Sequence, residues 1–294
     1  MSILTAPIIA LFKLTLEPVA PFTWFGLSLS TLDVVAAFRL CIILRQIKES
    51  MYRDHIAKVP GAAQTIAPRA FARDLATTMT VVYGGEVMSS PLLGVPVSFM
   101  LSGVVPIFYG VIQAIVEALP SVPVMSIETE LPLSFLDAFT RAYLLCDLIP
   151  PVVTTNTSPV ISTSPWTLLL TSFITANGGF FLTNLFSFLN PTPLAIQTPP
   201  ELQPYGWTAT DLWCAPLVTA LYALLTHAQP FWADAHGFLA AFLGSDVSAK
   251  GVVMALDANE ARAVCTLVLT GLFVTRTVKN FGAAAQPKEK VKTQ

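Results

Sequence analysis

Two long stretches of this sequence contain no charged residue. The first lies between Glu86 and Glu117, and the second lies between Asp147 and Glu201. A soluble domain has about 25% charged residues, whereas this chain has 12%, with 54% hydrophobic residues and a mean hydropathy of +0.66. A chain this apolar cannot hide its surface in one aqueous core. The sequence therefore predicts an all-α integral membrane protein.

Apolar segments long enough to cross a bilayer, which takes about 20 residues, occur seven times. The predicted spans are residues 24–44, 71–89, 95–119, 131–149, 166–189, 212–231 and 261–278. A shorter apolar patch, 238–243, is expected to lie at the membrane surface rather than to cross it.

Lysine and arginine are concentrated in two places. The connection between the first and second spans carries Arg45, Lys48, Arg53, Lys58 and Arg69. The tail, residues 279–294, carries Lys279, Lys288, Lys290 and Lys292. Six predicted spans separate the two basic clusters, and an even number of crossings puts both clusters on the same side of the membrane. The positive-inside rule identifies this side as the cytosol. The N-terminal segment, 1–23, is then luminal, and the tail resembles a dilysine retrieval signal of the endoplasmic reticulum.

Three signatures recur in the same order in the two halves of the chain. Leu-Ser-x-Leu-Asp occurs at 29–33 and at 133–137, glycine pairs follow in the second and fifth spans, and prolines lie in the third and sixth. Three spans per repeat force the halves into opposite orientation. The sequence thus predicts a 3+3 inverted repeat, 24–119 and 120–232, followed by a connecting loop and a seventh helix, 233–278. Such repeats place a binding or conduction site at their interface.

The glycine pairs are Gly84-Gly85 and Gly178-Gly179, which lie 94 residues apart. A glycine pair allows two helices to pack backbone to backbone, or it marks a discontinuous helix beside a pathway. Both interpretations are open, and the second makes a group of residues candidates for a pore. An acidic group beside unwound backbone would attract a cation. The candidates are Tyr83, Gly84, Gly85, Glu86, Asn177, Gly178 and Gly179.

Charged residues inside predicted spans each cost about 2.5–3.5 kcal/mol on insertion scales, and four of them, two in the first span and two in the fourth, are candidates for function. They are Asp33, Arg39, Asp137 and Arg141. We expect Asp33 near mid-bilayer, about nine residues into its helix. Asp137 and Arg141 lie four residues apart and share a helix face, so a pair within the helix is one alternative. Cross-repeat pairs, Asp33 with Arg141 and Asp137 with Arg39, are predicted; whether these charges line a pathway or only pin the bundle is open.

The sequence favours neither an enzyme nor a metal site. The four cysteines, at 41, 146, 214 and 265, have no CxxC spacing and lie in apolar runs, so they are expected to be small buried side chains. The histidines, at 55, 227 and 236, show no ligand spacing, and GxSxG, HExxH and phosphate-loop motifs do not occur. No basic patch indicates nucleic-acid binding. We therefore expect no catalytic residue, no metal and no nucleic-acid partner.

The glycine pairs and the proline turns after them carry a resemblance to a known family. Gly84-Gly85 followed by 92–96, Leu-Leu-Gly-Val-Pro, together with Asn177-Gly178-Gly179 and the seven-span order, resembles the trimeric intracellular cation (TRIC) channels. The resemblance covers about 24–280. Animal members carry Lys-Glu-Val in the fourth span, where this chain has 137–141, Asp-Ala-Phe-Thr-Arg.

This resemblance implies a homotrimer with one pore per subunit in the endoplasmic reticulum or nuclear membrane. It implies conduction of monovalent cations, K⁺ above all, as counter-ion current for calcium release, and binding of a phosphoinositide or another anionic lipid near the pore. Two alternatives remain open: a secondary transporter of a small solute or ion that uses the same inverted repeat, and a membrane scaffold that conducts nothing.

Overall fold

The computed structural model describes residues 3–19, 29–59, 70–192, 194–243 and 253–282. Within these residues the regular structure is helical, apart from one isolated bridge between Pro18 and Ser30. The helices are α1 (Thr5–Thr15), α2 (Thr31–Lys58), α3 (Phe71–Leu93), α4 (Ser98–Leu101), α5 (Val104–Ala118), α6 (Ile127–Tyr143), the π-helix η2 (Leu144–Leu148), α7 (Ile149–Thr154), α8 (Pro159–Ser162), α9 (Pro165–Leu185), the 3-10 turns η3 (Pro200–Leu202) and η4 (Gly206–Thr208), α10 (Thr210–Thr226), α11 (Pro230–Phe242) and α12 (Ala258–Phe281).

The all-α prediction is confirmed for this part of the chain. Two of the described helices, α9 and α12, are long and apolar enough to cross a membrane by length and composition. Three further apolar helices, α1, α5 and α10, are shorter. The structure is thus compatible with a helical membrane protein.

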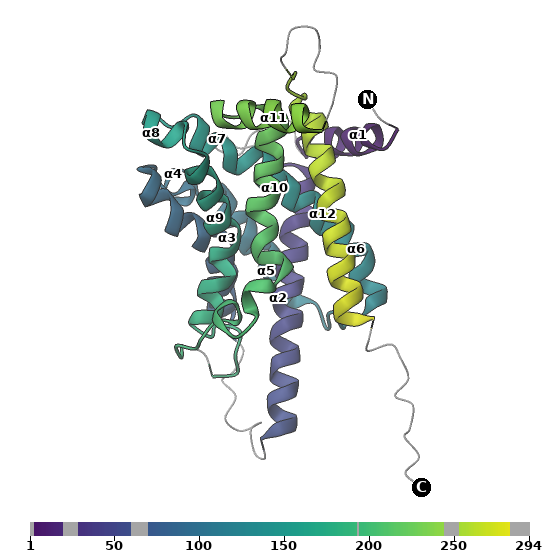
Figure 1. Cartoon of the computed structure of the whole chain (residues 1–294). Helices are drawn as coiled ribbons and strands as arrows, with labels where there is room; N and C mark the ends of the chain where they lie inside the picture. Colours follow the sequence, from purple (N-terminus) through teal and green to yellow (C-terminus); the bar gives the residue numbers. More distant parts are fainter. Residues whose placement is uncertain (1–2, 20–28, 60–69, 193, 244–252, 283–294) are drawn as a thin grey trace.

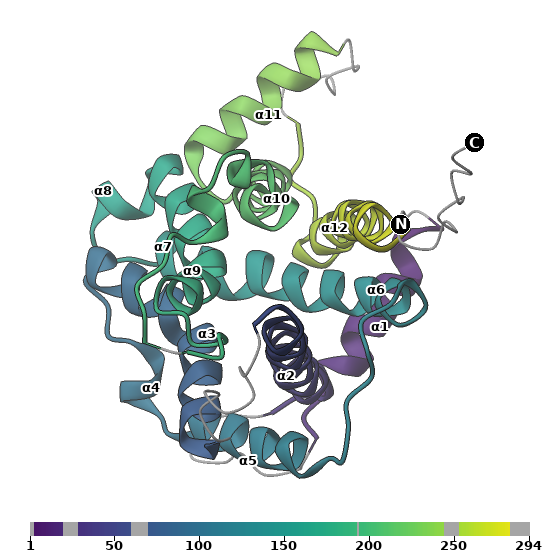
Figure 2. The same cartoon turned by 90° about the horizontal axis from the view of Figure 1, so that it is seen from below.

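The long helices run along a common direction, whereas α1 and α11 lie across one end of the bundle (Figure 1). The C-terminal ends of α2 and of α12 both point toward the opposite end of the bundle (Figure 1). Seen from below, α11 projects outward beyond the bundle (Figure 2). The predicted start of the first span at 24, Arg69 and the tail lysines at 288, 290 and 292 lie outside the described residues.

Helix α2 differs most from its predicted segment. It begins at a capping box, in which the Ser30 side chain accepts from the Asp33 backbone amide and the Asp33 carboxylate accepts from the Ser30 amide. It then continues through a polar sequence to Lys58, because Arg, Gln, Lys and Glu are good helix formers and Arg45 pairs with Glu49 one turn on. A hydropathy profile detects neither the capping box nor the helix-forming preference of these polar residues. The expectation that Asp33 lies about nine residues into its helix is therefore wrong, since Asp33 lies in the first turn of α2.

Two other predicted spans, 95–119 and 131–149, are not single regular α-helices, because glycine and proline residues interrupt the helical hydrogen bonding. The segment expected from residue 95 begins with the short α4 and continues as α5, because Gly94 ends α3 in the left-handed region, at a φ of 67°, and Pro96 follows. Helix α6 passes through the π-turn η2 before α7. Pro150 and Pro151 have no N–H to donate to the preceding turn, which leaves room for the wider hydrogen-bond pattern.

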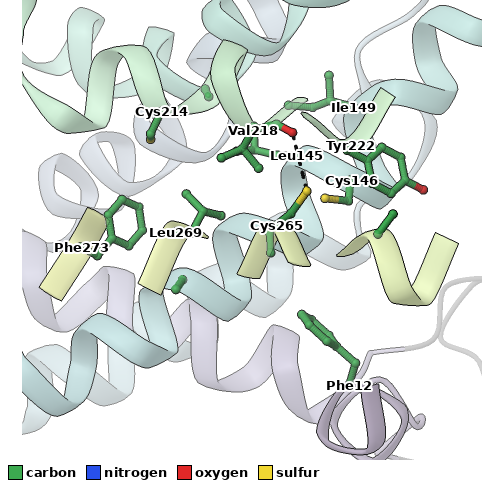
Figure 3. Packing of buried hydrophobic residues seen from close by; sticks show 14 of the residues in the cluster. Phe12, Leu145, Cys146, Ile149, Cys214, Val218, Tyr222, Cys265, Leu269 and Phe273 are labelled. Carbon is green, nitrogen blue, oxygen red and sulfur yellow. Dashed lines mark hydrogen bonds between the residues drawn. The ribbon is translucent and has the colours of Figure 1, made fainter. Parts of the chain in front are cut away.

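The largest apolar core joins α6, α10 and α12, and Phe12 of α1 packs against it (Figure 3). Cys146, Cys214 and Cys265 are part of this core, and the Cys265 thiol lies 3.8 Å from the Val218 carbonyl oxygen. All four cysteines are free and buried, as the sequence predicts. The predicted surface patch 238–243 lies at the end of α11, where Phe238 and Phe242 are exposed.

Candidate functional site

The two glycine pairs meet at a crossing of α3 and α9, the most extensive helix contact in the described part of the chain. The Cα of Gly179 would lie 3.0 Å from a Cβ placed on Gly84, and the Cα of Gly85 would lie 2.8 Å from one on Gly178. Real Cβ atoms do not approach backbone so closely. This crossing, which we call the glycine crossing, can therefore form only because four glycines leave the space.

Both helices are continuous through the glycine crossing. The expectation of a discontinuous or unwound helix at the glycine pairs is wrong, and the alternative of close backbone packing is the one that the structure supports. The physical reason is that the missing Cβ lets a neighbouring backbone pack into the space beside the helix, and this packing offsets the cost of about 0.5–1 kcal/mol of each glycine within a helix.

The contacts of the glycine crossing come in matched pairs. A Cβ on Gly85 would lie 2.1 Å from the Thr175 carbonyl oxygen, and one on Gly179 would lie 2.0 Å from the Val81 carbonyl oxygen. Gly179 follows Gly85 by 94 positions, and Thr175 follows Val81 by the same interval. Each half of the chain therefore makes the same contact with the other half, as two elements related by a twofold axis do.

Two of the candidate residues, Tyr83 and Glu86, contact the short helix α4. The Tyr83 ring packs edge-on against Phe99, with ring centroids 5.1 Å apart. The Glu86 carboxylate accepts from the Ser98 amide at 2.6 Å and from the Ser98 hydroxyl at 2.7 Å, so it caps the short helix α4. The expectation that Glu86 stands beside unwound carbonyls is wrong, because the backbone there is helical and the carboxylate already has partners.

Four of the other candidates, Arg39, Asp137, Arg141 and Asn177, line a cavity of about 420 Å³ between α2, α6, α9, α10 and α12. We call it the charged cavity. Its lining combines three arginines with three acidic residues and two amides: Arg39, Arg141, Arg276, Asp137, Glu201, Asp211, Asn177 and Asn184. Charges inside a helical bundle are costly unless they find partners or line a water-filled path, so this concentration marks the cavity as the candidate site.

Arg39 anchors one side of the charged cavity. Its guanidinium donates to Asp137 at 3.0 and 3.1 Å and to Glu130 at 2.7 Å. Arg39 is 9% exposed, so the two α6 carboxylates compensate a nearly buried cation on α2. The predicted pair of Arg39 with Asp137 is confirmed. Glu130, which is also buried, was not predicted as a partner because it lies before the apolar part of its segment.

Arg276 of α12 closes another side of the cavity and was not predicted from the sequence. Its guanidinium forms an ion pair with Asp211 at the start of α10 and lies 3.9 Å from Asp137. It also stacks over the Phe273 ring, 4.5 Å from the centroid. The sequence does contain an indication of its role. Arg276 lies inside the seventh predicted span, where a charged residue is as unusual as it is in the first and fourth spans.

Arg141 and Asn177 lie on adjacent walls of the cavity. Arg141 donates to the Ala176 carbonyl at 3.0 Å, and its buried Nε has no hydrogen-bond partner among the described residues. The Asn177 amide donates to the carbonyls of Phe173 and Leu212, so it ties α9 to α10. The predicted pair of Asp33 with Arg141 is wrong, because Asp33 serves as a helix cap instead.

The glycine crossing separates the charged cavity from a second cavity of different character. Ala176 and Asn177 face the charged side, whereas Tyr83 and Gly84 line an apolar cavity of about 680 Å³ bounded by α3, α5 and α9. The charged cavity offers both signs of charge in near balance, which suits a small hydrated ion or a zwitterionic solute. The apolar cavity offers no such groups.

Comparison with protein-family models, with curated proteins and with solved structures finds no match for this chain. The residues of the charged cavity therefore have to be interpreted from their own chemistry. In the described part of the chain, no three side chains of His, Cys, Asp or Glu are gathered as a metal site.

Proposed function

We propose that this chain is a seven-span membrane protein, a 3+3 inverted repeat plus α12, that conducts monovalent cations through the charged cavity. K⁺ is the expected ion, as the resemblance to the TRIC channels implies. The observation that carries the proposal is the concentration of charged side chains from α2, α6, α10 and α12 around one cavity inside the helical bundle.

The pattern of helix contacts supports the inverted repeat. In the first half α3 packs against α5, and in the second half α9 packs against α10. The helices that carry the glycine pairs, α3 and α9, meet each other through contacts that repeat at the interval of 94 residues. The charged cavity lies beside this crossing, where an inverted repeat is expected to hold its ion or substrate.

The acidic residues supply the preference for cations. Asp137, Glu201 and Asp211 line the cavity, and Glu130 lies behind Arg39. Two of the three arginines are held by these carboxylates, which leaves Arg141 as the one arginine of the lining without an ion pair among the described residues. The lining itself has three carboxylates and three arginines, and Glu130 behind Arg39 adds one negative charge, a small excess that favours a cation over an anion.

A secondary transporter is the second candidate, and the ion pairs are the observation that favours it. The pair between Arg39 and Asp137 joins the two halves of the chain, and Arg276 joins α12 to both α6 and α10. Pairs that bridge separate bodies can break and form as the halves rock against each other, which is the movement of alternating access.

The remaining parts of the proposal come from the resemblance. We propose a homotrimer in the endoplasmic reticulum or nuclear membrane, with the N-terminus luminal and the C-terminus cytosolic, supplying counter-ion current for calcium release. A phosphoinositide or another anionic lipid is the proposed lipid partner; the arginines at the charged cavity are the cationic groups suited to its phosphates.

The test is single-channel recording of the purified protein in a planar bilayer with K⁺ on both sides. A channel gives discrete unitary currents, and Asn177→Leu, which replaces an amide of the charged cavity by an apolar side chain, is expected to reduce them. Thr80→Val is the matched control, because Thr80 lines the apolar cavity on the other side of the glycine crossing.

If the unitary currents of Asn177→Leu equal those of the wild type, the ions do not pass through the charged cavity. If folded protein gives no unitary current, solute uptake into vesicles separates the transporter from the scaffold. A transporter shows saturable flux, and a scaffold shows none.

A further inference from the structure

Two histidines meet at the end of the bundle where α10 gives way to α11. The Nε2 of His227 lies 2.9 Å from the Nδ1 of His236, and the two rings are nearly perpendicular, with centroids 5.1 Å apart. Nine residues separate them in the sequence, a spacing that does not indicate a metal site. They meet because His227 ends α10 in the left-handed region, at a φ of 53°, and so turns the chain back.

The turn that carries the pair is fixed by its own hydrogen bonds. The Gln229 side chain donates to the carbonyls of Ser162 and Ser164, at 2.7 and 3.1 Å, and accepts from the Trp232 indole at 3.0 Å. Gln229 and Trp232 are buried. The start of α11 is therefore held against the beginning of α9, and His236, one turn further on, is held opposite His227.

The chemistry of the pair suits a metal ion. Both rings are only half-buried, so solvent reaches them. An imidazole ring in its neutral form has one nitrogen lone pair to offer to a metal ion. Neutral imidazole is the nitrogen ligand that Zn²⁺, Cu²⁺ and Ni²⁺ prefer in proteins.

We propose that His227 and His236 form a two-ligand site for a divalent transition metal ion, with water completing the coordination. Two nitrogens at about 2.0–2.1 Å from a tetrahedral Zn²⁺ lie about 3.3 Å apart, so the rings have to separate and turn slightly from their present 2.9 Å. The bound ion replaces the hydrogen bond between the rings and fastens α11 to the end of α10.

The site is independent of the conduction proposal, because it lies on the helix that crosses the end of the bundle and not at the charged cavity (Figure 1). The metal site links α11 to the end of α10, and its occupancy rises with the metal concentration. A metal ion on that side of the membrane then stabilises the position of α11 relative to α10.

The experiment uses the full chain, purified in detergent without a histidine tag, and titrated with Zn²⁺ against a chromophoric chelator. The sequence contains three histidines, so His55→Ala is the matched control. We expect one Zn²⁺ per chain for the wild type and for His55→Ala. His236→Gln is expected to weaken binding by at least about tenfold, the effect that even the loss of an outer-shell partner reaches. His227→Asn removes the other imidazole and is expected to give the same loss of binding. Asparagine is chosen at this position because it tolerates the left-handed backbone and so keeps the turn.

A second measurement reports on the structure. Amide hydrogen exchange across 226–243 is expected to slow when Zn²⁺ is added to the wild type and to stay unchanged in His236→Gln. Zn²⁺ that fails to bind the wild type at up to millimolar concentration would overturn the proposal. Equal affinity in the wild type and in folded His236→Gln would also overturn it, as would loss of binding in His55→Ala.

Discussion

Adding one methyl group at the glycine crossing is expected to force two helices apart. In Gly85→Ala the new Cβ would lie 2.1 Å from the Thr175 carbonyl oxygen, and in Gly179→Ala it would lie 2.0 Å from that of Val81. Ordinary contact begins at 3.4 Å, so α3 and α9 must separate by about 1.3 Å in the first variant. The obstacle is backbone, which cannot rotate away as a side chain can.

The magnitude follows from the cost of overpacking. An extra methyl in a well-packed interior costs about 1–3 kcal/mol, against a gain of about 0.5–1 kcal/mol from replacing glycine within a helix. Gly271→Ala is the matched control, because Gly271 also lies within a helix and a Cβ there would meet nothing within 4 Å. We therefore expect Gly85→Ala to lower the free energy of unfolding and Gly271→Ala to leave it unchanged or raise it.

The assay is denaturant unfolding in detergent micelles, followed by far-UV circular dichroism. The double variant Gly85→Ala/Gly179→Ala adds a sharper test. Both methyls press on the same crossing, so once the helices have separated for one, the second costs less and the two losses are not additive. Equal stability of Gly85→Ala and Gly271→Ala would refute the close approach of α3 and α9.

Three further outcomes are expected. Arg39→Ala leaves the carboxylate of Asp137 without its closest partner and lowers the free energy of unfolding by about 3–5 kcal/mol, as breaking a buried ion pair does. The control Arg53→Ala, at an exposed position, changes the free energy of unfolding by less than about 0.5 kcal/mol. Chemical denaturation measures both values. Glu86→Gln keeps an acceptor for Ser98 and lies outside the charged cavity, so K⁺ current through bilayers is expected to equal that of the wild type, and a large loss would show that Glu86 is on the pathway. Arg276→Gln frees two carboxylates at the cavity and is expected to raise the permeability ratio of K⁺ to Cl⁻, measured from reversal potentials under a KCl gradient.

The sequence was sufficient for the helical class and for much of the site. Charge-free segments and intramembrane charges depend on local composition, and the pair of Arg39 with Asp137 could be inferred because each charge needs a partner. The boundaries of α2 and α5 were missed for a different reason. They depend on a capping box at Ser30 and on the left-handed turn at Gly94, which hydropathy does not record.

The two meanings of a glycine pair could not be separated from the sequence. A glycine allows both a break and a close approach, and the choice depends on which helix lies opposite. The structure brings Gly178 against Gly85, a partner 93 positions away, so the backbone of one helix fills the space left by the other. The meeting of His227 and His236 was missed likewise, because it depends on the direction in which the turn after α10 folds back.

The proposal that ions pass through the charged cavity is tested most directly by removing the positive charge of Arg141. This arginine forms no ion pair among the described residues, so Arg141→Gln leaves no carboxylate unpartnered. A unit charge about 8 Å from a passing ion raises its energy by about 0.5 kcal/mol even in water, so its loss is expected to raise the unitary K⁺ current about twofold or more. Arg53→Gln, outside the cavity, is expected to change nothing. Unitary currents that are identical in wild type and folded Arg141→Gln would contradict a path through the charged cavity.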